Sequence, residues 1–279
     1  MTDRIDALLQ QLSQRDLAII AGVNQYRFLT TQQVARRHFD VLPDTAIPRR
    51  ANHALARLRS LGVVATLNRR IGGVRAGSAG YVWTVTDVGR QIVAANSSDV
   101  RPPRIRAYEP SLAFLEHTLA VAETALVADE AARRGLCHVE ALEVEPEAWR
   151  SYVGPTGAIV RLKPDLGMVT EAGGFEDRWF IEVDRDTEPP SRIIAKCLAY
   201  ERYRATGIEQ RDRGIFPATV WIVPSPRRAT QLRERIASDS RLLQQNYAVI
   251  TLDKFPAILS SGLEDFNQKE SGQKGGEPS

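Results

Sequence analysis

A pair of adjacent strands that carry acidic residues constrains this chain more than any other feature. A glycine-containing turn separates two apolar-rich runs, residues 162–170 and 179–183, and this pattern predicts a β-hairpin. Asp165 lies on the first strand, and Glu182 and Asp184 lie on the second. Side chains alternate along a strand, so Glu182 and Asp184 leave the same face. The sequence therefore predicts a cluster of carboxylates at one edge of a sheet.

Such a cluster requires positive charge close by. Carboxylates that repel one another remain ionised together only where a cation or a basic side chain compensates them. Hard divalent cations such as Mg²⁺ prefer oxygen ligands. The cluster of Asp165, Glu182 and Asp184 therefore favours a hard divalent cation such as Mg²⁺.

The bulk properties predict a globular protein of two domains. The chain has 279 residues, with 43% hydrophobic and 25% charged residues, which is ordinary for folded domains. It contains no apolar run of the roughly 18 residues that a membrane span needs, and no signal-peptide core. Cys137 and Cys197 lack metal-ligand spacing, so we expect free buried thiols and a cytoplasmic location.

Charge is unevenly distributed along the chain. Residues 1–107 contain 16 Arg and 7 Asp but no Lys and no Glu, a net charge of +9. The whole chain carries +3, so the remaining residues carry −6. A basic first half beside an acidic second half suggests that the first half binds a polyanion.

The pattern of residues 1–95 predicts a winged helix-turn-helix domain. Thr30 followed by Gln33 has the spacing of a capping box. Three helices are expected before a two-stranded wing, which is the order of a winged helix. The expected helices are 15–28, 31–39 and 49–61, and the expected strands are 63–68 and 80–86.

The third of these helices is the expected recognition helix. Arginine favours planar contacts with phosphates and base edges, and the chain uses it here without lysine. The alternative is a solvated face on a winged helix that docks another protein. The predicted DNA-binding residues, on this helix and at the wing tip, are Arg49, Arg50, Asn52, Arg57, Arg69, Arg70 and Arg75.

A polar, proline-containing linker is expected at residues 96–110, followed by an α/β (α+β) domain at residues 111–259. Its predicted order is a long helix, three strands, a helix and further strands, which gives a central mixed sheet flanked by helices. Residues 260–279 are polar and rich in glycine, and we expect them to be disordered.

Two resemblances follow from the acidic hairpin. Pro164-Asp165 followed by Glu182-x-Asp184 resembles the PD-(D/E)xK nuclease core. The wider run of Lys163-Pro164-Asp165, Phe180 to Arg185 and Thr187-Glu188 resembles the replication-relaxation family of plasmids and integrative elements, over roughly residues 14–255. That resemblance implies a winged helix joined to a nuclease-like domain. It also implies a role in replication or mobilisation, in which origin DNA is recognised and then nicked or relaxed.

The resemblance also assigns roles to single residues. Asp165 and Glu182 match the two acidic positions that would hold Mg²⁺ or Mn²⁺, with Asp184 as a third metal ligand, and Glu116 matches an additional acidic residue on the preceding helix. The sequence departs from the nuclease pattern at Asp184, where a lysine is usual. Lys196 on the following helix is the first candidate for the missing cation, and Lys163 is the second.

Several alternatives remain open at this point. Lys196 either serves catalysis or only neutralises the cluster through a salt bridge. The second domain is either an active metal-dependent endonuclease or an inactive nuclease fold in a regulator or accessory protein. A restriction or defence endonuclease is a third function. Double-stranded DNA is the expected partner, and a homodimer and other mobilisation proteins are further partners to test.

Overall fold

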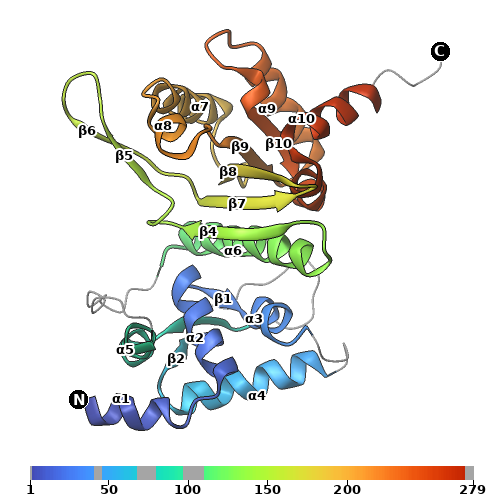
Figure 1. Cartoon of the computed structure of the whole chain (residues 1–279). Coiled ribbons are helices and arrows are strands. Elements are labelled where there is room, and N and C mark those ends of the chain that lie inside the picture. The colour runs from blue at the N-terminus through green and yellow to red at the C-terminus, as the bar shows by residue number, and fades with distance from the viewer. Residues whose placement is uncertain (1, 41–45, 68–79, 97–109, 274–279) are drawn as a thin grey trace. The chain divides into compact units, whose positions relative to one another are not determined.

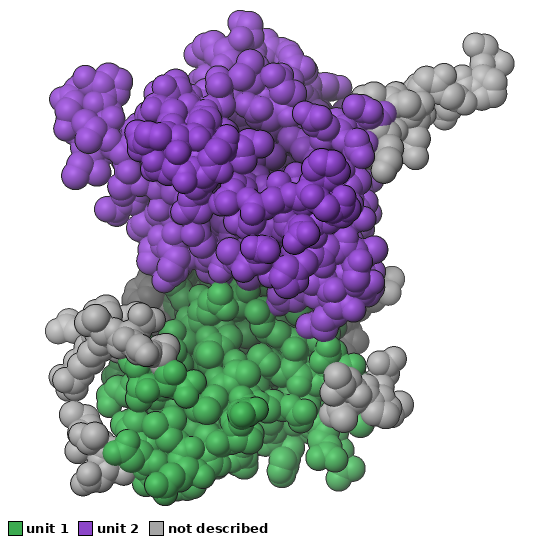
Figure 2. All heavy atoms as spheres, viewed as in Figure 1, with its two compact units in different colours: residues 1–126 green, residues 127–279 purple. Residues whose placement is uncertain are grey.

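The computed structural model describes residues 2–40, 46–67, 80–96 and 110–273, with side chains as far as residue 268. The chain divides into two compact units, residues 1–126 and 127–279, shown in green and purple in Figure 2. Within the described residues, no helix is both long enough and apolar enough to cross a membrane. The expected linker at 96–110 falls almost entirely outside the described residues, as do the wing-tip residues Arg69, Arg70 and Arg75.

The first unit combines five helices with a small antiparallel sheet, and the N-terminal part of a sixth helix joins them (Figure 1). Its sheet has the order β1-β3-β2. Four helices precede the β2–β3 pair, and α2, α3 and α4 correspond to the three that the sequence predicts. The elements are α1 (Thr2–Leu9), α2 (Gln14–Tyr26), β1 (Leu29–Thr30), α3 (Thr31–His38), α4 (Ile47–Ser60), β2 (Val64–Thr66), β3 (Val82–Val85) and α5 (Asp87–Asn96).

Capping boxes fix the starts of two helices in this unit. Thr30 caps α3, because its hydroxyl accepts from the Gln33 amide while the Gln33 side chain accepts from the Thr30 amide. Ser13 and Asp16 make the same reciprocal pair at the start of α2. These bonds satisfy amides that the first helical turn would otherwise leave unpaired.

Helix α6 (Leu112–Arg133) changes the expected domain boundary. The sequence places residue 111 at the start of the second domain, whereas the first compact unit extends to Leu126. The reason is hydrophobic: Leu115 and Leu119 of α6 are buried against Phe28 and Val82. The N-terminal part of α6 therefore belongs to the core of the first unit.

The second unit is built on a five-stranded mixed sheet of order β10-β9-β8-β7-β4. The β10, β9 and β8 strands are parallel, and β7 and β4 continue the sheet in antiparallel fashion. The predicted mixed sheet with flanking helices is confirmed. The strands are β4 (His138–Val144), β7 (Leu166–Ala172), β8 (Phe175–Val183), β9 (Ala218–Val223) and β10 (Tyr247–Thr251).

Helices cover this sheet. α7 (Pro190–Arg204) and α9 (Pro226–Ala237) share one apolar cluster with β9 and β10. α10 (Phe255–Gln273) packs against β7 and β10, and Gly262 on this helix lies beside the Asp177 side chain of β8. Asp177 and Glu182 differ by an odd number of residues, so α10 lies on the face opposite to Glu182. The remaining elements are α8 (Ile208–Arg213) and two 3₁₀ helices, Gln244–Asn246 and Leu252–Lys254.

Two further features complete the second unit. Residues 150–162 form a separate two-stranded sheet, β5 (Arg150–Val153) and β6 (Ile159–Leu162), which extends from the body of the unit (Figure 1). The expected disordered tail is helical as far as Gln273. Buried Leu263 and Phe266 continue the apolar face of α10 past residue 260, so the polar composition of this segment was misleading.

Candidate functional site

The β7–β8 register brings the first two predicted acidic residues together, although Asp165 lies one residue before β7 and Asp184 one residue after β8 rather than on the strands themselves. Leu166 pairs with Ile181, so one further step along the same register places Asp165 opposite Glu182. The Val183 amide donates to Asp165 Oδ2 at 2.8 Å. Both side chains are buried, as expected from their place in the sheet but unusual for carboxylates.

Glu182 is held by two side chains of α7. Lys196 Nζ donates to Glu182 Oε2, and the Tyr200 hydroxyl donates to Glu182 Oε1. Glu182 is 1% exposed. Lys196 and Tyr200 are one helical turn apart, so they reach the same carboxylate from one helix face. Each carboxylate oxygen of Glu182 therefore has a partner within the protein.

The electrostatics of this cluster follow from its burial. Burial raises the pKa of Glu182 to about 8; the attraction of Lys196 opposes this rise and the repulsion of Asp165 adds to it. Burial lowers the pKa of Lys196, but the two carboxylates outweigh it, and the net pKa of Lys196 is raised. Burial and the Glu182 charge also hold the pKa of Tyr200 well above its usual range. Lys196 is thus the cluster's cation at neutral pH.

Asp184 has a separate partner. Arg228 Nε donates to Asp184 Oδ2 at 2.7 Å, and both side chains are almost fully buried. Asp184 Oδ1 accepts from the Asp186 amide at 3.0 Å. Arg228 also pairs with Asp186 and donates to the Glu188 carbonyl at 2.7 Å. Asp184 is therefore neutralised by α9, while Glu182 is neutralised by α7.

No sequence pattern marks Arg228 as the partner of Asp184. It is one of four arginines in α9, and nothing in that run marks it as the buried one. Tyr200 had a weak signal, because it lies four residues after Lys196 on the same helix face.

Two further predicted residues are Glu116 and Lys163. Glu116 is half-buried on α6, in the part of that helix that belongs to the first unit. Lys163 is exposed and lies over the Trp149 ring, 4.5 Å from its centroid. A role for Glu116 at the acidic cluster stays a prediction.

This arrangement does not suit a divalent cation. Within the described residues, no group of three or more Asp, Glu, His or Cys side chains is placed to hold a metal ion. The oxygens of Glu182 and Asp184 already accept from the protein's own donors. A cation at this position would have to compete with Lys196 and Arg228 for these carboxylates.

Helix α4 presents the predicted DNA-binding residues on an exposed face. Ala51, Leu55 and Leu58 are buried on the opposite face. The exposed side chains of α4 include Arg49, Arg50, Asn52, His53 and Arg59.

Arg57 differs from its neighbours on α4. It forms an ion pair with Asp16, whose side chain is 4% exposed. Burial raises the pKa of Asp16, but hydrogen bonds from Ser13 and Arg57 outweigh it and lower the net pKa. Arg57 thus ties α4 to the start of α2.

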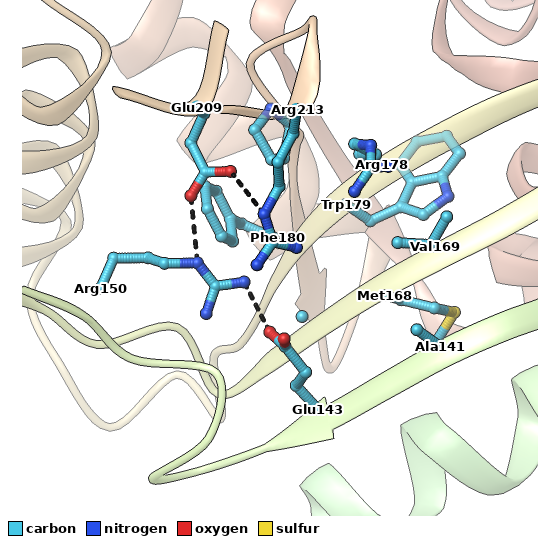
Figure 3. Close-up of a pocket in the computed structure, with 12 residues that line it drawn as sticks. Ala141, Glu143, Arg150, Met168, Val169, Arg178, Trp179, Phe180, Glu209 and Arg213 are labelled. Atoms are coloured by element: carbon cyan, nitrogen blue, oxygen red, sulfur yellow. Dashed lines mark hydrogen bonds and ion pairs between the residues drawn. The ribbon is translucent and has the colours of Figure 1, made fainter. Parts of the chain in front are cut away.

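A second buried polar network surrounds Arg150, at the start of β5 (Figure 3). Arg150 donates to Glu143 Oε2 at 2.5 Å and to Glu209 Oε1 at 3.0 Å. Tyr203 also donates to Glu209, at 2.8 Å, and Arg213 lies 3.6 Å from its other oxygen. Glu143, Arg150, Glu209 and Arg213 line a cavity of about 30 Å³, room for roughly one water. The sequence did not reveal this network, because its members are far apart in the chain.

Comparison with known proteins gives one clear result. No curated protein matches the chain. The replication-relaxation family model matches residues 20–219, which is more than half of the chain and includes both the α4 face and the acidic cluster. The chain therefore belongs to the replication-relaxation family.

Proposed function

We propose that this protein binds duplex DNA during the replication or mobilisation of a plasmid or integrative element, and that it acts there without cleaving DNA itself. Membership of the replication-relaxation family supports the replication context. The observation that carries DNA binding is the exposed face of α4, with Arg49, Arg50, Asn52 and Arg59 outward over a buried apolar face. A helix of this kind fits the major groove.

Charge supports the same proposal. Residues 1–107 carry a net +9, without any lysine. Arginine pairs with phosphates and with guanine edges in a bidentate manner. The DNA complex should therefore weaken steeply as salt is raised.

The state of the acidic cluster supports a non-enzymatic role for the second unit. Lys196 and Tyr200 donate hydrogen bonds to the Glu182 carboxylate, and Arg228 donates one to the Asp184 carboxylate. We infer an accessory or regulatory protein of the cytoplasm whose second unit keeps a nuclease-like sheet without a working metal site. A homodimer and other mobilisation proteins are the partners that this role would need.

A metal-dependent endonuclease that nicks or relaxes origin DNA is the second candidate. One observation favours it: Asp165, Glu182 and Lys196 come together, and two acids with a lysine are the residue types of the nuclease pattern. For this candidate, Lys196 would have to leave Glu182 when DNA and Mg²⁺ or Mn²⁺ bind.

Two experiments test these proposals. Binding to a labelled duplex should weaken in an Arg49→Ala/Arg50→Ala variant and keep its strength in Arg241→Ala, because Arg241 is paired with Asp239 on the second unit. Equal DNA affinity of the wild type and the double variant would show that α4 is not the DNA contact.

The second experiment concerns cleavage. Supercoiled plasmid carrying the element's origin is incubated with protein and Mg²⁺ or Mn²⁺, beside Glu182→Gln. Our proposal expects no open-circular product and no Mn²⁺ binding by calorimetry. Open-circular product that disappears in Glu182→Gln would establish the endonuclease instead.

A further inference from the structure

The β5–β6 hairpin carries an exposed face that neither the sheet nor the acidic cluster uses. Val153 pairs directly with Ile159, and Ser151 pairs with Arg161. These four side chains share one face of the ribbon, and all four are exposed. Val153 is 68% exposed and Ile159 is 76% exposed. Single exposed apolar residues are common, whereas a cross-strand apolar pair exposed on a projecting ribbon is a candidate contact surface.

Positive charge lies along the same face. Arg161 and Lys163 follow Ile159 at alternate positions, and both lie over the Trp149 ring, at 5.5 and 4.5 Å from its centroid. Arg161 also donates to Ser151 Oγ at 3.4 Å. Residues 149–163 contain three basic residues and no acidic one, although the chain after residue 107 is acidic overall. The face therefore complements a polyanion.

The end of the hairpin nearest the sheet is anchored to the body of the second unit. Arg150 is held between Glu143 and Glu209 (Figure 3), and Tyr152 and Leu162 are buried against α7 side chains. A two-stranded hairpin alone is marginally stable in water, so this anchoring is what keeps the ribbon in place. The tip, with Pro155 and Thr156, is exposed.

We propose that the β5–β6 hairpin is a second DNA contact, in which Arg161 and Lys163 bind phosphates and the Val153–Ile159 pair enters a groove of the duplex. A two-stranded ribbon fits the major groove, and apolar side chains at such sites pack against base edges or wedge between base steps. This proposal rests on the proposed DNA-binding function and adds a contact from the second unit to that of α4.

The test uses full-length protein and a fluorescein-labelled mixed-sequence duplex, with affinity measured by anisotropy over a series of salt concentrations. Arg161→Ala/Lys163→Ala should bind several-fold more weakly and lower the salt slope by about two, since each phosphate contact contributes about one. Val153→Ser/Ile159→Ser should bind more weakly at an unchanged salt slope, because it removes no charge.

Matched controls come from the same unit. Phe175→Ser removes an apolar side chain that is also 76% exposed, at the β7–β8 turn, and should bind DNA like wild type. Arg211→Gln removes an exposed arginine already paired with Asp212 and should also bind like wild type. All of these positions are exposed, so circular dichroism should show folded variants.

The outcomes separate the two proposals. If wild type binds no duplex, the proposed function itself fails. If DNA binding by the wild type depends on Arg49 and Arg50, and both hairpin variants bind DNA with wild-type affinity, the proposed DNA-binding function is supported and the hairpin proposal is overturned. Hairpin variants that bind DNA normally but lose self-association in gel filtration would also overturn it, and would assign the face to a protein partner.

Discussion

Arg228 and Asp184 form an ion pair at 2.7 Å in which both side chains are almost fully buried, so the third acidic residue of the cluster is neutralised from α9. Strand alternation places Asp184 and Glu182 on one face, but Asp184 binds a different cation from the one that binds Glu182. The cluster is thus two neutralised sites, one facing α7 and the other facing α9.

Replacing Arg228 should destabilise the protein strongly. Arg228→Met leaves Asp184 buried without its cation, and breaking a buried pair costs about 3–5 kcal/mol. Urea unfolding measures the loss. Arg227→Met, at an exposed neighbouring position, should have little effect. Equal stability of the two variants would contradict the role assigned to Arg228.

Glu182 should make stability depend on pH. Its pKa is about 8 in the folded protein and near 4.5 when unfolded, so the folded state binds the proton more tightly. The stabilisation that Glu182 contributes to the folded state is fully present below the pKa of the unfolded state, and it is lost as the pH rises towards 8. The free energy of unfolding should fall by up to about 1.4 kcal/mol per pH unit between these values.

Urea titrations at several pH values, compared between wild type and Glu182→Gln, isolate this contribution. The variant cannot ionise at this position, so its stability should fall less over the same range. Parallel curves for the two proteins would show that Glu182 does not titrate in this window.

Arg57 and Arg50 should behave differently although both lie on α4. Arg57→Ala removes the partner of buried Asp16 and should destabilise the first unit by about 1–3 kcal/mol. Arg50→Ala should weaken DNA binding and leave thermal unfolding unchanged, because Arg50 is exposed. Thermal melts and anisotropy on both variants measure the two effects; a stable Arg57→Ala variant would argue against the structural role.

Helix α6 should stabilise the first unit through Leu115. Leu115 is fully buried with Phe28 and Val82, so Leu115→Ala should cost about 2–5 kcal/mol. Leu112→Ala is the control on the same helix, because Leu112 is 49% exposed. Hydrogen exchange should show faster exchange in α2 and β3 for Leu115→Ala. Unchanged hydrogen exchange in α2 and β3 would contradict the assignment of the N-terminal part of α6 to the core of the first unit.

Local signals in the sequence were sufficient for several elements. The Thr30 and Gln33 pair marks the start of α3, since a capping box depends only on residues three positions apart. The hairpin that contains Asp165 and Glu182 follows from alternation and a glycine turn. The tail was predicted less well, because its polar composition hid the buried positions of α10.

By itself, the sequence determined that acidic residues lie on or directly beside neighbouring strands, that a basic helix precedes them, and that a mixed sheet forms. Each of these depends on short-range periodicity. Only the tertiary structure decided which cation each carboxylate meets: Lys196 lies 14 residues from Glu182, and Arg228 lies 44 residues from Asp184. It also decided that Arg57 binds Asp16 rather than facing solvent like Arg50. Pairings between distant elements depend on how helices pack on the sheet, and no local pattern encodes that packing.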